Sequence, residues 1–391
     1  HAHCDASDGD PTLDEMVEEY YKADYDILAM TDHGVITNGW TSERETNGIF
    51  NKFRKVYPMS EENYERITKG LDRGGRGMTD IRGGIECNMA VISKTHVNGY
   101  FTTYGQGEWG IENDYRTAPV EIERAGGYSV LNHVGDWVDS GRFPHRSHWN
   151  VYIAYFAGIF IDCPSCLGME IVNNTDRVTR GDRELWDELL QVVIPKGRNI
   201  WAFADDDSEK LNEVGRSFEF FVLPENNEAN VKKAMKDGNF FAASKYYKTT
   251  DGVGDFDGDG NVPLVTGIKV DQKANTITVA TDPTRDCRVI EWIADGKVIA
   301  TGNTIDLNDY EKDLGCYIRF QMKGSGGVTY SQPFELQYKG RIDKPVPSWA
   351  LWAFKTEAGQ KFMKFYHSHS FALGALIAEK IRILIEDNIK K

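Results

Sequence analysis

The sequence predicts an α/β fold followed by a smaller all-β module. Two observations predict the first part: helical and strand patterns alternate through residues 1–245, and metal-binding side chains recur where the predicted strands end. A third observation predicts the second part, because short strands separated by turns dominate residues 265–340. With 391 residues, of which 40% are hydrophobic, the chain is long enough to form both cores.

Each helical segment of the first part precedes a short apolar strand. Apolar residues recur at helical spacing from Leu13 to Tyr21 after the start signal Pro11-Thr12, and the apolar run 26–30 follows. The same order of helix and strand occurs in APVEIERAGG–YSVLNHVG and in DRELWDELLQ–NIWAFADDD. An α/β barrel carries its active site at the C-terminal ends of parallel strands, so the motif positions agree with a barrel. The periodicity alone does not distinguish a barrel from an open sheet.

A change of composition near residue 245 predicts a domain boundary. The acidic, glycine-rich segment 246–264 is typical of a linker. Strand patterns follow in residues 265–340, where Asp295-Gly296 between two apolar runs predicts a hairpin turn. We interpret residues 265–340 as a β-sandwich module, and residues 341–391 as an aromatic-rich and then helical tail without an assigned role.

Charge and hydropathy narrow the classes of partner. A net charge of −15 disfavours nucleic acid, because phosphate backbones are bound by basic surfaces. No stretch is long and apolar enough to span a bilayer, and the C-terminal segment FALGALIAEKIRILI predicts an amphipathic helix that packs or forms a homo-oligomer. The first residue is His rather than Met, so either a leader has been removed or the sequence begins within a longer protein. The β module, the candidate calcium loop of the acidic linker and the missing leader favour an extracytoplasmic over a cytoplasmic location.

The six cysteines leave the redox compartment open. Cys163-Pro-Ser-Cys166 has the spacing of half a zinc ribbon, but the sequence has no second CxxC. A local disulfide or two idle thiols are therefore the alternatives for this pair. Cys287 and Cys316 both lie in the β module and could form a disulfide across it.

Histidine and acidic residues occur in short motifs whose order predicts a metal site. Alternation along a strand directs His1 and His3 to the same side, so both can reach one ion. Each motif alone has an ordinary structural interpretation, such as a helix cap or a buried histidine, but the ordered set at successive strand ends does not. Imidazoles and carboxylates are the ligands of divalent transition metals. The candidate ligands are His1, His3, Asp8, His33, Glu86, His96, His133, Asp205 and Asp207.

The order HxH…SDG, TDHG, E…H, NHVG and then an Asp-rich motif resembles the PHP (polymerase and histidinol phosphatase) superfamily of metal-dependent phosphoesterases over residues 1–245. The module at 265–340 is similar to the sandwich that follows this domain in many bacterial members. The resemblance implies a distorted (β/α)7 barrel with two or three divalent Zn, Mn or Fe ions. It also implies hydrolysis of a small-molecule phosphate mono- or diester by a metal-bound hydroxide.

The resemblance further assigns the ligands to individual metals. The first metal would be held by His1, His3, Glu86 and Asp205, the second by Glu86, His96 and His133, and the third by Asp8, His33 and Asp207. Catalysis is expected to depend on His33, Glu86 and Asp205.

Two departures from the family pattern concern the ends of this motif series. The last motif usually reads Asp-x-His, and Asp207 replaces that His. A carboxylate makes the third site harder in character and favours Mn, Fe or Mg over Zn, with Asp206 as an alternative ligand. The chain also starts at the first motif, so the barrel strand that should lead into His1 is largely absent.

Two other functions remain alternatives at this stage. The same metal cluster could polarise a carbonyl, which would make the protein a hydrolase of an amide or a carbamate-type ester. A non-catalytic binding or assembly protein could keep the metals for stability alone, and the Asp207 departure is the one observation in its favour.

A calcium site is an alternative for the acidic linker. Asp255, Asp257 and Asp259, followed by Gly260, resemble the opening of an EF-hand loop, but Thr266 stands where the bidentate Glu belongs. A plain acidic turn is the competing interpretation. Four basic residues are weaker candidates for phosphate contacts, and a surface role is favoured for each: Arg146, His148, Arg177 and Arg180.

Overall fold

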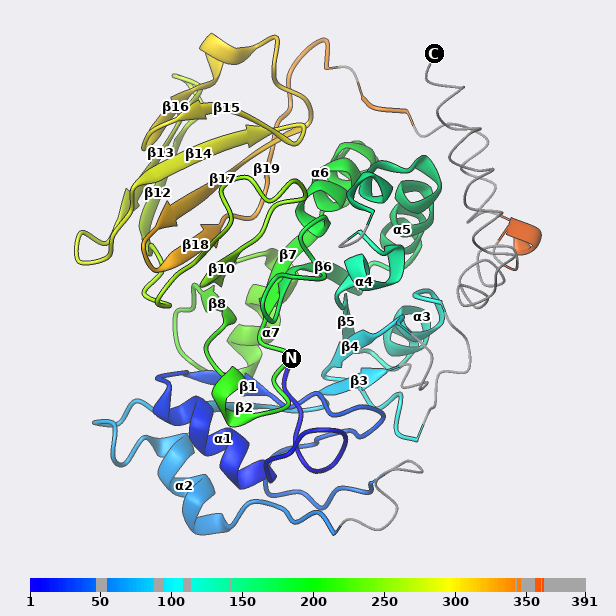
Figure 1. Ribbon diagram of the computed structural model, residues 1–391, viewed down its shortest axis with the longest axis vertical. Coiled ribbons are helices and arrows are strands. Elements are labelled where there is room, and N and C mark those ends of the chain that lie inside the picture. The colour runs from blue at the N-terminus through cyan, green and yellow to red at the C-terminus, as the bar shows by residue number, and fades with distance from the viewer. Residues whose placement is uncertain are drawn as a thin grey trace.

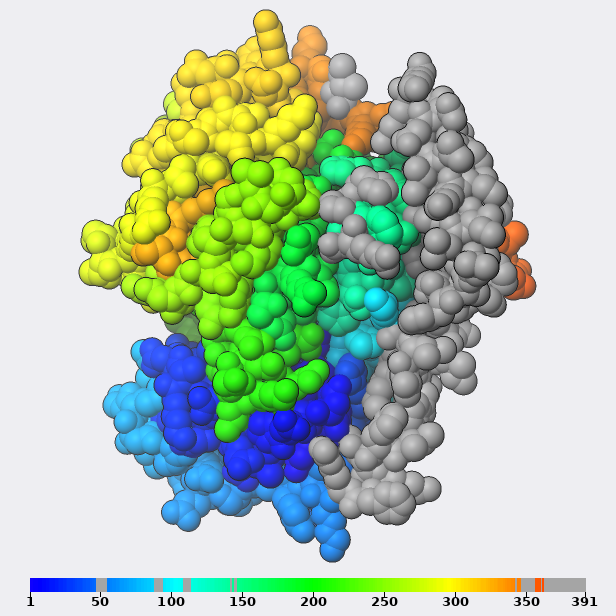
Figure 2. Space-filling view, in the orientation of Figure 1, coloured from blue at the N-terminus to red at the C-terminus, as the bar shows by residue number. Residues whose placement is uncertain are grey.

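A computed structural model describes residues 1–46, 55–87, 94–107, 114–140, 143–341, 343–345, 356–359 and 361. In Figure 1 the α/β part, coloured blue to green, lies below the yellow and orange strands of the second part. The space-filling view shows the two parts packed against each other (Figure 2). In the described chain no helix has the length and the apolar character needed to cross a membrane.

A five-stranded sheet forms the centre of the α/β part. Its strands follow one another in chain order: β3 (Ile85–Cys87), β4 (Val97–Tyr100), β5 (Tyr128–Leu131), β6 (Cys166–Asn173) and β7 (Trp201–Asp205). The first three strands are antiparallel, whereas β5, β6 and β7 are parallel. Every residue of β6 is buried, as expected of a parallel strand covered on both faces.

The α/β part also contains helices. They are α1 (Leu13–Lys22), α2 (Glu61–Lys69), α3 (Thr117–Arg124), α4 (Val134–Val138), α5 (Asn150–Asp162), α6 (Asp182–Val193) and α7 (Glu228–Asp237), with 3-10 turns η1 (Pro144–His148), η2 (Ile194–Lys196) and η3 (Leu211–Glu213). The predicted helix at the N-terminus is confirmed, because Thr12 and Glu15 form a capping box where α1 begins. The predicted segments at α3, β5, α6 and β7 are confirmed as well.

The N-terminal residues form a parallel strand pair and connect to both edges of the five-stranded sheet. The pair consists of β1 (Ile27–Ala29) and β2 (Thr79–Ile81). Single bridges connect Ala2 with Ser208, beyond β7, and His33 with Glu86, in β3. The backbone N–H of Thr31 also donates to the carbonyl of Ala2, at 2.9 Å. The N-terminal residues thus lie between the ends of β1 and β7, and the closed PHP-type barrel stays a prediction.

The second part contains two packed layers of strands. One sheet has the order β12 (Val265–Asp271), β13 (Thr276–Thr281) and β16 (Thr304–Asp306). The other has the order β15 (Lys297–Thr301), β14 (Val289–Ala294), β17 (Tyr317–Gly324), β18 (Gly327–Tyr330), β9 (Phe240–Ser244) and β8 (Ser217–Phe221), and β19 (Phe334–Glu335) pairs with β17. A 3-10 turn, η4, spans Leu307–Tyr310. Strands β8 and β9 precede residue 245, so this sheet continues across the predicted boundary.

The predicted hairpin turn at residues 295–296 is confirmed. Asp295 and Gly296 join β14 to β15 with φ angles of 49° and 75°. A two-residue turn with positive φ at both central residues matches the twist of the strands that it joins. The pair Asp-Gly tolerates these φ angles.

A buried ion pair connects the second part to α6. The Arg319 guanidinium on β17 donates to both carboxylate oxygens of Asp187 on α6, at 2.7 and 2.6 Å. The Tyr317 hydroxyl donates to the same carboxylate at 2.7 Å, and the Arg319 guanidinium lies 4.9 Å from the ring centre of Trp186. Because both charged side chains are at most 5% exposed, each depends on the other for charge compensation.

The cysteines form no disulfide. None of the six cysteines takes part in a disulfide, which makes the disulfide alternative for Cys163 and Cys166 wrong and leaves two idle thiols. Burial raises the pKa of Cys163 to about 11 and of Cys166 to about 12, so both stay protonated at neutral pH. The bridge between Cys287 and Cys316 is also absent, and the Cys316 thiol instead lies 3.6 Å from the carbonyl of Leu190.

The acidic linker does not gather its carboxylates around one point. It contains the short strands β10 (Tyr246–Tyr247) and β11 (Phe256–Asp257), which pair with each other. Asp255 accepts a hydrogen bond from the backbone N–H of Thr249, Asp257 pairs with Lys248, and Asp259 accepts from Asn261. The calcium prediction therefore has no support from these contacts. The predicted C-terminal helix, with its residues 371–385, lies outside the described residues.

His148 on η1 bridges two carboxylates of α6. Its Nε2 lies 2.9 Å from Glu184 and its Nδ1 lies 3.3 Å from Glu188. Hydrogen bonds with these carboxylates raise the pKa of His148 to about 9, from an ordinary value of about 6.5. The contacts tie η1 to α6 and leave no support for a phosphate-binding role of this histidine.

The raised pKa predicts a pH-dependent contribution of His148 to stability. The folded protein favours the imidazolium, so the stabilisation is complete below about pH 6.5 and is lost as the pH rises through about 9. Since 45% of the side chain is exposed, we expect less than about 1 kcal/mol. The check is the difference in free energy of unfolding between the wild type and His148→Gln, measured at about pH 6 and about pH 10. If the two proteins differ in free energy of unfolding by the same amount at both pH values, the raised pKa of His148 is contradicted.

Candidate metal centre

The first histidine motif is held in place by a buried aspartate. The Asp32 carboxylate is fully buried and accepts hydrogen bonds from the backbone N–H of Cys4, at 2.8 Å, and from the Ser7 hydroxyl, at 2.7 Å. Ser7 in turn lies 3.3 Å from Nδ1 of His3. Asp32 therefore orients the loop that carries His3 and Asp8, while its neighbour His33 reaches the centre itself.

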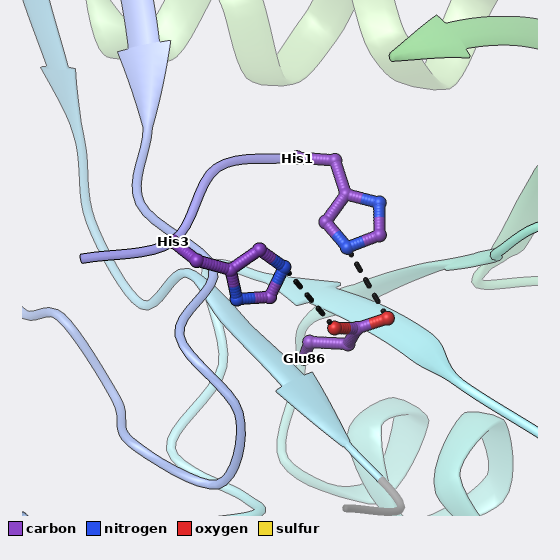
Figure 3. A group of neighbouring side chains, drawn as sticks. All are labelled: His1, His3 and Glu86. Carbon is purple, nitrogen blue, oxygen red and sulfur yellow. Dashed lines mark ion pairs between the residues drawn. The ribbon is translucent and has the colours of Figure 1, made fainter. Parts of the chain in front are cut away.

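Five imidazoles converge on the carboxylate of Glu86. Figure 3 shows the His1 and His3 rings directed at the two oxygens of Glu86. The shortest nitrogen–oxygen distances to this carboxylate are 3.2 Å for His1, 3.4 Å for His3, 2.9 Å for His33, 3.2 Å for His96 and 3.6 Å for His133. Oε1 faces His1, His96 and His133, and Oε2 faces His3 and His33. Glu86 thus presents one oxygen to each of two sets of imidazoles.

The five imidazoles form a closed ring. Around it, successive ring centres lie 5.1 Å apart for His1–His3, 4.8 Å for His3–His33, 4.8 Å for His33–His96, 5.0 Å for His96–His133 and 6.1 Å for His133–His1. Protonated imidazoles at such spacing repel one another, whereas neutral ones supply lone pairs to bound cations. The ring has the composition of a ligand set rather than of a hydrophobic core.

The electrostatics of the centre favour positive charge between the carboxylates. Burial raises the pKa of Glu86, but the imidazoles of His33, His1 and His96 outweigh it and hold that pKa well below its usual range. Burial lowers the pKa of His33, but Glu86 and Asp8 raise it well above its ordinary value. His96 is different, because burial dominates and lowers its pKa. Protons on the imidazoles or bound metal ions would each supply this positive charge.

The three consecutive aspartates have different surroundings. Asp207 places Oδ1 3.1 Å from Nε2 of His1 and 3.2 Å from Nε2 of His3. Asp205 lies 3.1 Å from the backbone nitrogen of His1. Asp206 accepts three hydrogen bonds from the backbone N–H groups of residues 215–217. Asp206 therefore stabilises a turn, and Asp207 is the carboxylate that joins the imidazoles.

Two of the centre's residues have left-handed backbone conformations. The φ angle is 28° at His133 and 48° at Asp207. Residues other than glycine rarely adopt positive φ, and such strain is found where a side chain must be aimed at a functional site. The His133 side chain is a member of the ring of five imidazoles, and the Asp207 side chain contacts two other members, His1 and His3.

The structure groups the candidate ligands differently from the assignment that the resemblance implies. Ligand atoms lie within 4.8 Å of one another in three described groups: His1, His3 and Glu86; His3, Asp8 and His33; and His33, Glu86 and His96. Asp207 lies with His1 and His3 rather than with Asp8 and His33. His133 is the most distant imidazole from Glu86, and His33 takes its place in the third group.

The centre is closed on one side and open on the other. The side chains of His1, His3 and Glu86 are at most 1% exposed, whereas Asp8 is 48% exposed and Asp207 is 23% exposed. Access to the buried part is therefore from the side of Asp8. Arg146 takes no part in this opening, because its guanidinium packs 4.4 Å from the ring centre of Phe143 and donates to the carbonyl of Val138.

The predicted ligand set omits three buried polar residues of the centre. Asn132 donates to Glu86 Oε1 at 2.7 Å, and Asn173 donates to Asp207 at 3.0 Å. Glu170 on β6 is fully buried and lies 2.6 Å from His1 Nδ1. Burial raises the pKa of Glu170 to about 7, although His1 opposes the shift. A charged residue inside the apolar strand GMEIVN is the sequence signal that could have identified Glu170.

The residues present fit divalent transition metals. Nitrogen and carboxylate donors are the ligands that Zn, Mn and Fe share, and here they converge at a partly open site. Among the described residues, His133 Nδ1 and Asp205 Oδ2 are buried without a hydrogen-bond partner. Buried polar atoms without partners are rare in folded proteins, and a bound divalent ion would give these atoms a partner.

Comparisons with other proteins give a distant structural likeness. No protein-family model and no curated protein match the chain. Among solved structures, the chain is similar to a two-domain protein from Bacteroides vulgatus containing a predicted PHP-like metal-dependent phosphoesterase. The identity is 14%, the match covers 87% of this chain and 86% of that one, and the TM-score is 0.43. A likeness this distant leaves the function to be argued from the residues of the metal centre.

Proposed function

We propose that the protein is a metal-dependent phosphoesterase that hydrolyses a phosphate mono- or diester of a small molecule. The observation that carries the proposal is the closed ring of five imidazoles around the buried Glu86 carboxylate. Divalent ions held there would polarise a phosphoryl oxygen and lower the pKa of water.

The residues divide into two holding sites that share Glu86. His1, His3 and Asp207 surround one site, and His33, His96 and Asp8 surround the other. Each site has one imidazole at Glu86 Oε1 (His1 and His96) and one at Oε2 (His3 and His33), so both sites share this carboxylate, which would bridge two cations. An ester would approach from the side of Asp8, whose side chain is 48% exposed.

The chain's own charge makes cations a requirement for binding such a substrate. Asp8, Glu86, Asp205 and Asp207 all lie at the centre and would repel a phosphate group unless positive charge, from protonated imidazoles or from divalent ions, offsets them. Bound divalent ions would reverse the local charge. Hydrolysis is therefore expected to appear and disappear together with the metals.

The test is element analysis of the purified protein combined with assays on p-nitrophenyl phosphate and bis(p-nitrophenyl) phosphate. We expect about two or three Zn, Mn or Fe ions per chain, loss of hydrolysis after chelation, and recovery when metal is restored. His33→Ala should lose turnover and stay folded, whereas the surface change His148→Gln should retain turnover.

Three results would contradict the proposal in different ways. Absence of transition metal after reconstitution would remove the metal centre itself. Hydrolysis of a p-nitrophenyl carbamate or anilide, without hydrolysis of either phosphate ester, would assign the centre to carbonyl chemistry. Full turnover in His33→Ala would place the reaction elsewhere in the protein.

A further inference from the structure

We infer that Glu170 fixes the position of the ring proton on His1 and thereby keeps His1 Nε2 free to bind metal. Glu170 is in this sense a positioning residue, and the inference rests on the metal centre of the proposed function. It concerns a residue outside the ligand set, and it predicts an effect on metal affinity that does not require knowledge of the substrate.

Glu170 lies at the junction of three segments. It is fully buried in β6, and its Oε1 lies 2.6 Å from His1 Nδ1. Its Oε2 accepts two hydrogen bonds, from the backbone N–H of His133 at 2.6 Å and from the Asn173 side chain at 3.0 Å. One carboxylate therefore contacts a ligand of the buried side, the backbone of a second ligand, and an amide that also reaches Asp207.

Both partners of Oε2 act only as donors. A backbone N–H has no acceptor function. The orientation of the Asn173 amide is also determined, because its Nδ2 lies 3.0 Å from Glu170 and 3.0 Å from Asp207, and both of these groups accept. Oε2 must therefore remain an acceptor, and Oε1 is the atom left to face His1.

The carboxylate at Oε1 determines which ring nitrogen of His1 carries the proton. When Glu170 is ionised it only accepts, so Nδ1 of His1 donates, and in the neutral ring Nε2 keeps its lone pair. That Nε2 lies 3.1 Å from Asp207 Oδ1 and 3.2 Å from Glu86 Oε1, between two further ligand atoms. Carboxylate–histidine pairs of this kind orient metal ligands and increase their basicity.

Replacement of Glu170 by glutamine would move the ring proton of His1 without changing the shape of the side chain at position 170. The amide oxygen must take the place of Oε2, because two donors face it, so the amide NH2 is left facing His1 Nδ1. Nδ1 must then accept, and the proton moves to Nε2, which blocks metal binding there. The bond to the His133 backbone is retained, so the left-handed conformation of His133 is not disturbed by this change.

The test compares zinc affinity, by chelator competition, in the wild type, in Glu170→Gln and in Glu219→Gln. Glu219 is the matched control because it is a nearby carboxylate on β8 that accepts the backbone N–H of Ala204 at 2.8 Å and is not hydrogen-bonded to His1. We expect Glu170→Gln to weaken one zinc site about 10- to 100-fold and Glu219→Gln to leave it near the wild-type value. Thermal unfolding of the metal-free proteins should show that both variants are folded.

A second measurement needs no variant. In the zinc-loaded wild type, nitrogen-15 NMR of the His1 ring should show the proton on Nδ1 and the metal on Nε2. A proton on Nε2, or unchanged zinc affinity in Glu170→Gln, would overturn the inference. Wild-type protein that binds no zinc would overturn it together with the proposed function. Zinc binding that depends on Glu170 without ester hydrolysis would leave the inference standing and reject the proposed function alone.

Discussion

Glu86→Gln is expected to cause the largest loss of function. The carboxylate faces all five imidazoles of the centre, with nitrogen–oxygen distances from 2.9 to 3.6 Å. A glutamine would direct an NH2 group at one of the two imidazole sets, and that group cannot bind a metal. It would also remove the negative charge between the two holding sites. We expect loss of bound metal and a fall in turnover of roughly 100- to 1,000-fold.

The measurement for Glu86→Gln is metal content together with kcat for the best phosphate ester. Glu291→Gln is the control, because Glu291 is a carboxylate of β14 that pairs with Lys323 in the second part of the protein. The control should keep both metal and turnover. Wild-type metal content in Glu86→Gln would show that the imidazoles hold ions without this carboxylate, and would remove the basis for a bridged centre.

Asp187→Ala is expected to cause the largest loss of stability. The change leaves the Arg319 guanidinium buried at 3% exposure without its ion-pair partner, and it removes the acceptor of the Tyr317 hydroxyl. Breaking a buried ion pair on one side costs about 3–5 kcal/mol, because the remaining charge stays desolvated. Since Asp187 is on α6 and Arg319 is on β17, the loss should weaken the contact between the two parts of the protein.

Urea unfolding of the metal-free protein measures this effect. Asp237→Ala provides the comparison, since its partner Lys233 is 71% exposed and exposed pairs contribute about 0–1 kcal/mol. The double change Asp187→Leu with Arg319→Met should recover most of the lost stability, because it replaces the buried pair by apolar side chains. A loss for Asp187→Ala as small as that of Asp237→Ala would show that water reaches Arg319.

Local signals in the sequence predicted the elements that depend on local physics. The stripe from Leu13 to Tyr21 and the Thr12 cap identified α1, because one helix face is buried and the other is solvated. The Asp295-Gly296 turn was identified because few residue pairs tolerate positive φ. Helix α5 gave no such signal, since residues 152–160 are all buried and the polar face that periodicity requires is absent.

The candidate site was predictable as a set of residues but not as an arrangement. Histidines and acids at strand ends were sufficient to name the members of the imidazole ring. The position of Asp207 depends on its own left-handed backbone and on the N–H groups of residues 215–217 that hold Asp206. The position of Glu170 depends on contacts with residues 169 and 37 positions away in the chain. Contacts of this range leave no periodic pattern in the sequence.

The sheet that crosses residue 245 has a consequence for how the chain can be divided. Strand β9 is paired with β8 on one side and with β18 on the other, in register from Val328–Ser244 to Tyr330–Ala242. In a fragment that ended at residue 245, β9 would be an edge strand with unpaired N–H and carbonyl groups. Exposed edge strands of this kind pair with strands of other molecules and cause aggregation. We therefore expect the two parts to unfold as one cooperative unit, because strands after residue 265 complete the sheet that contains β8 and β9.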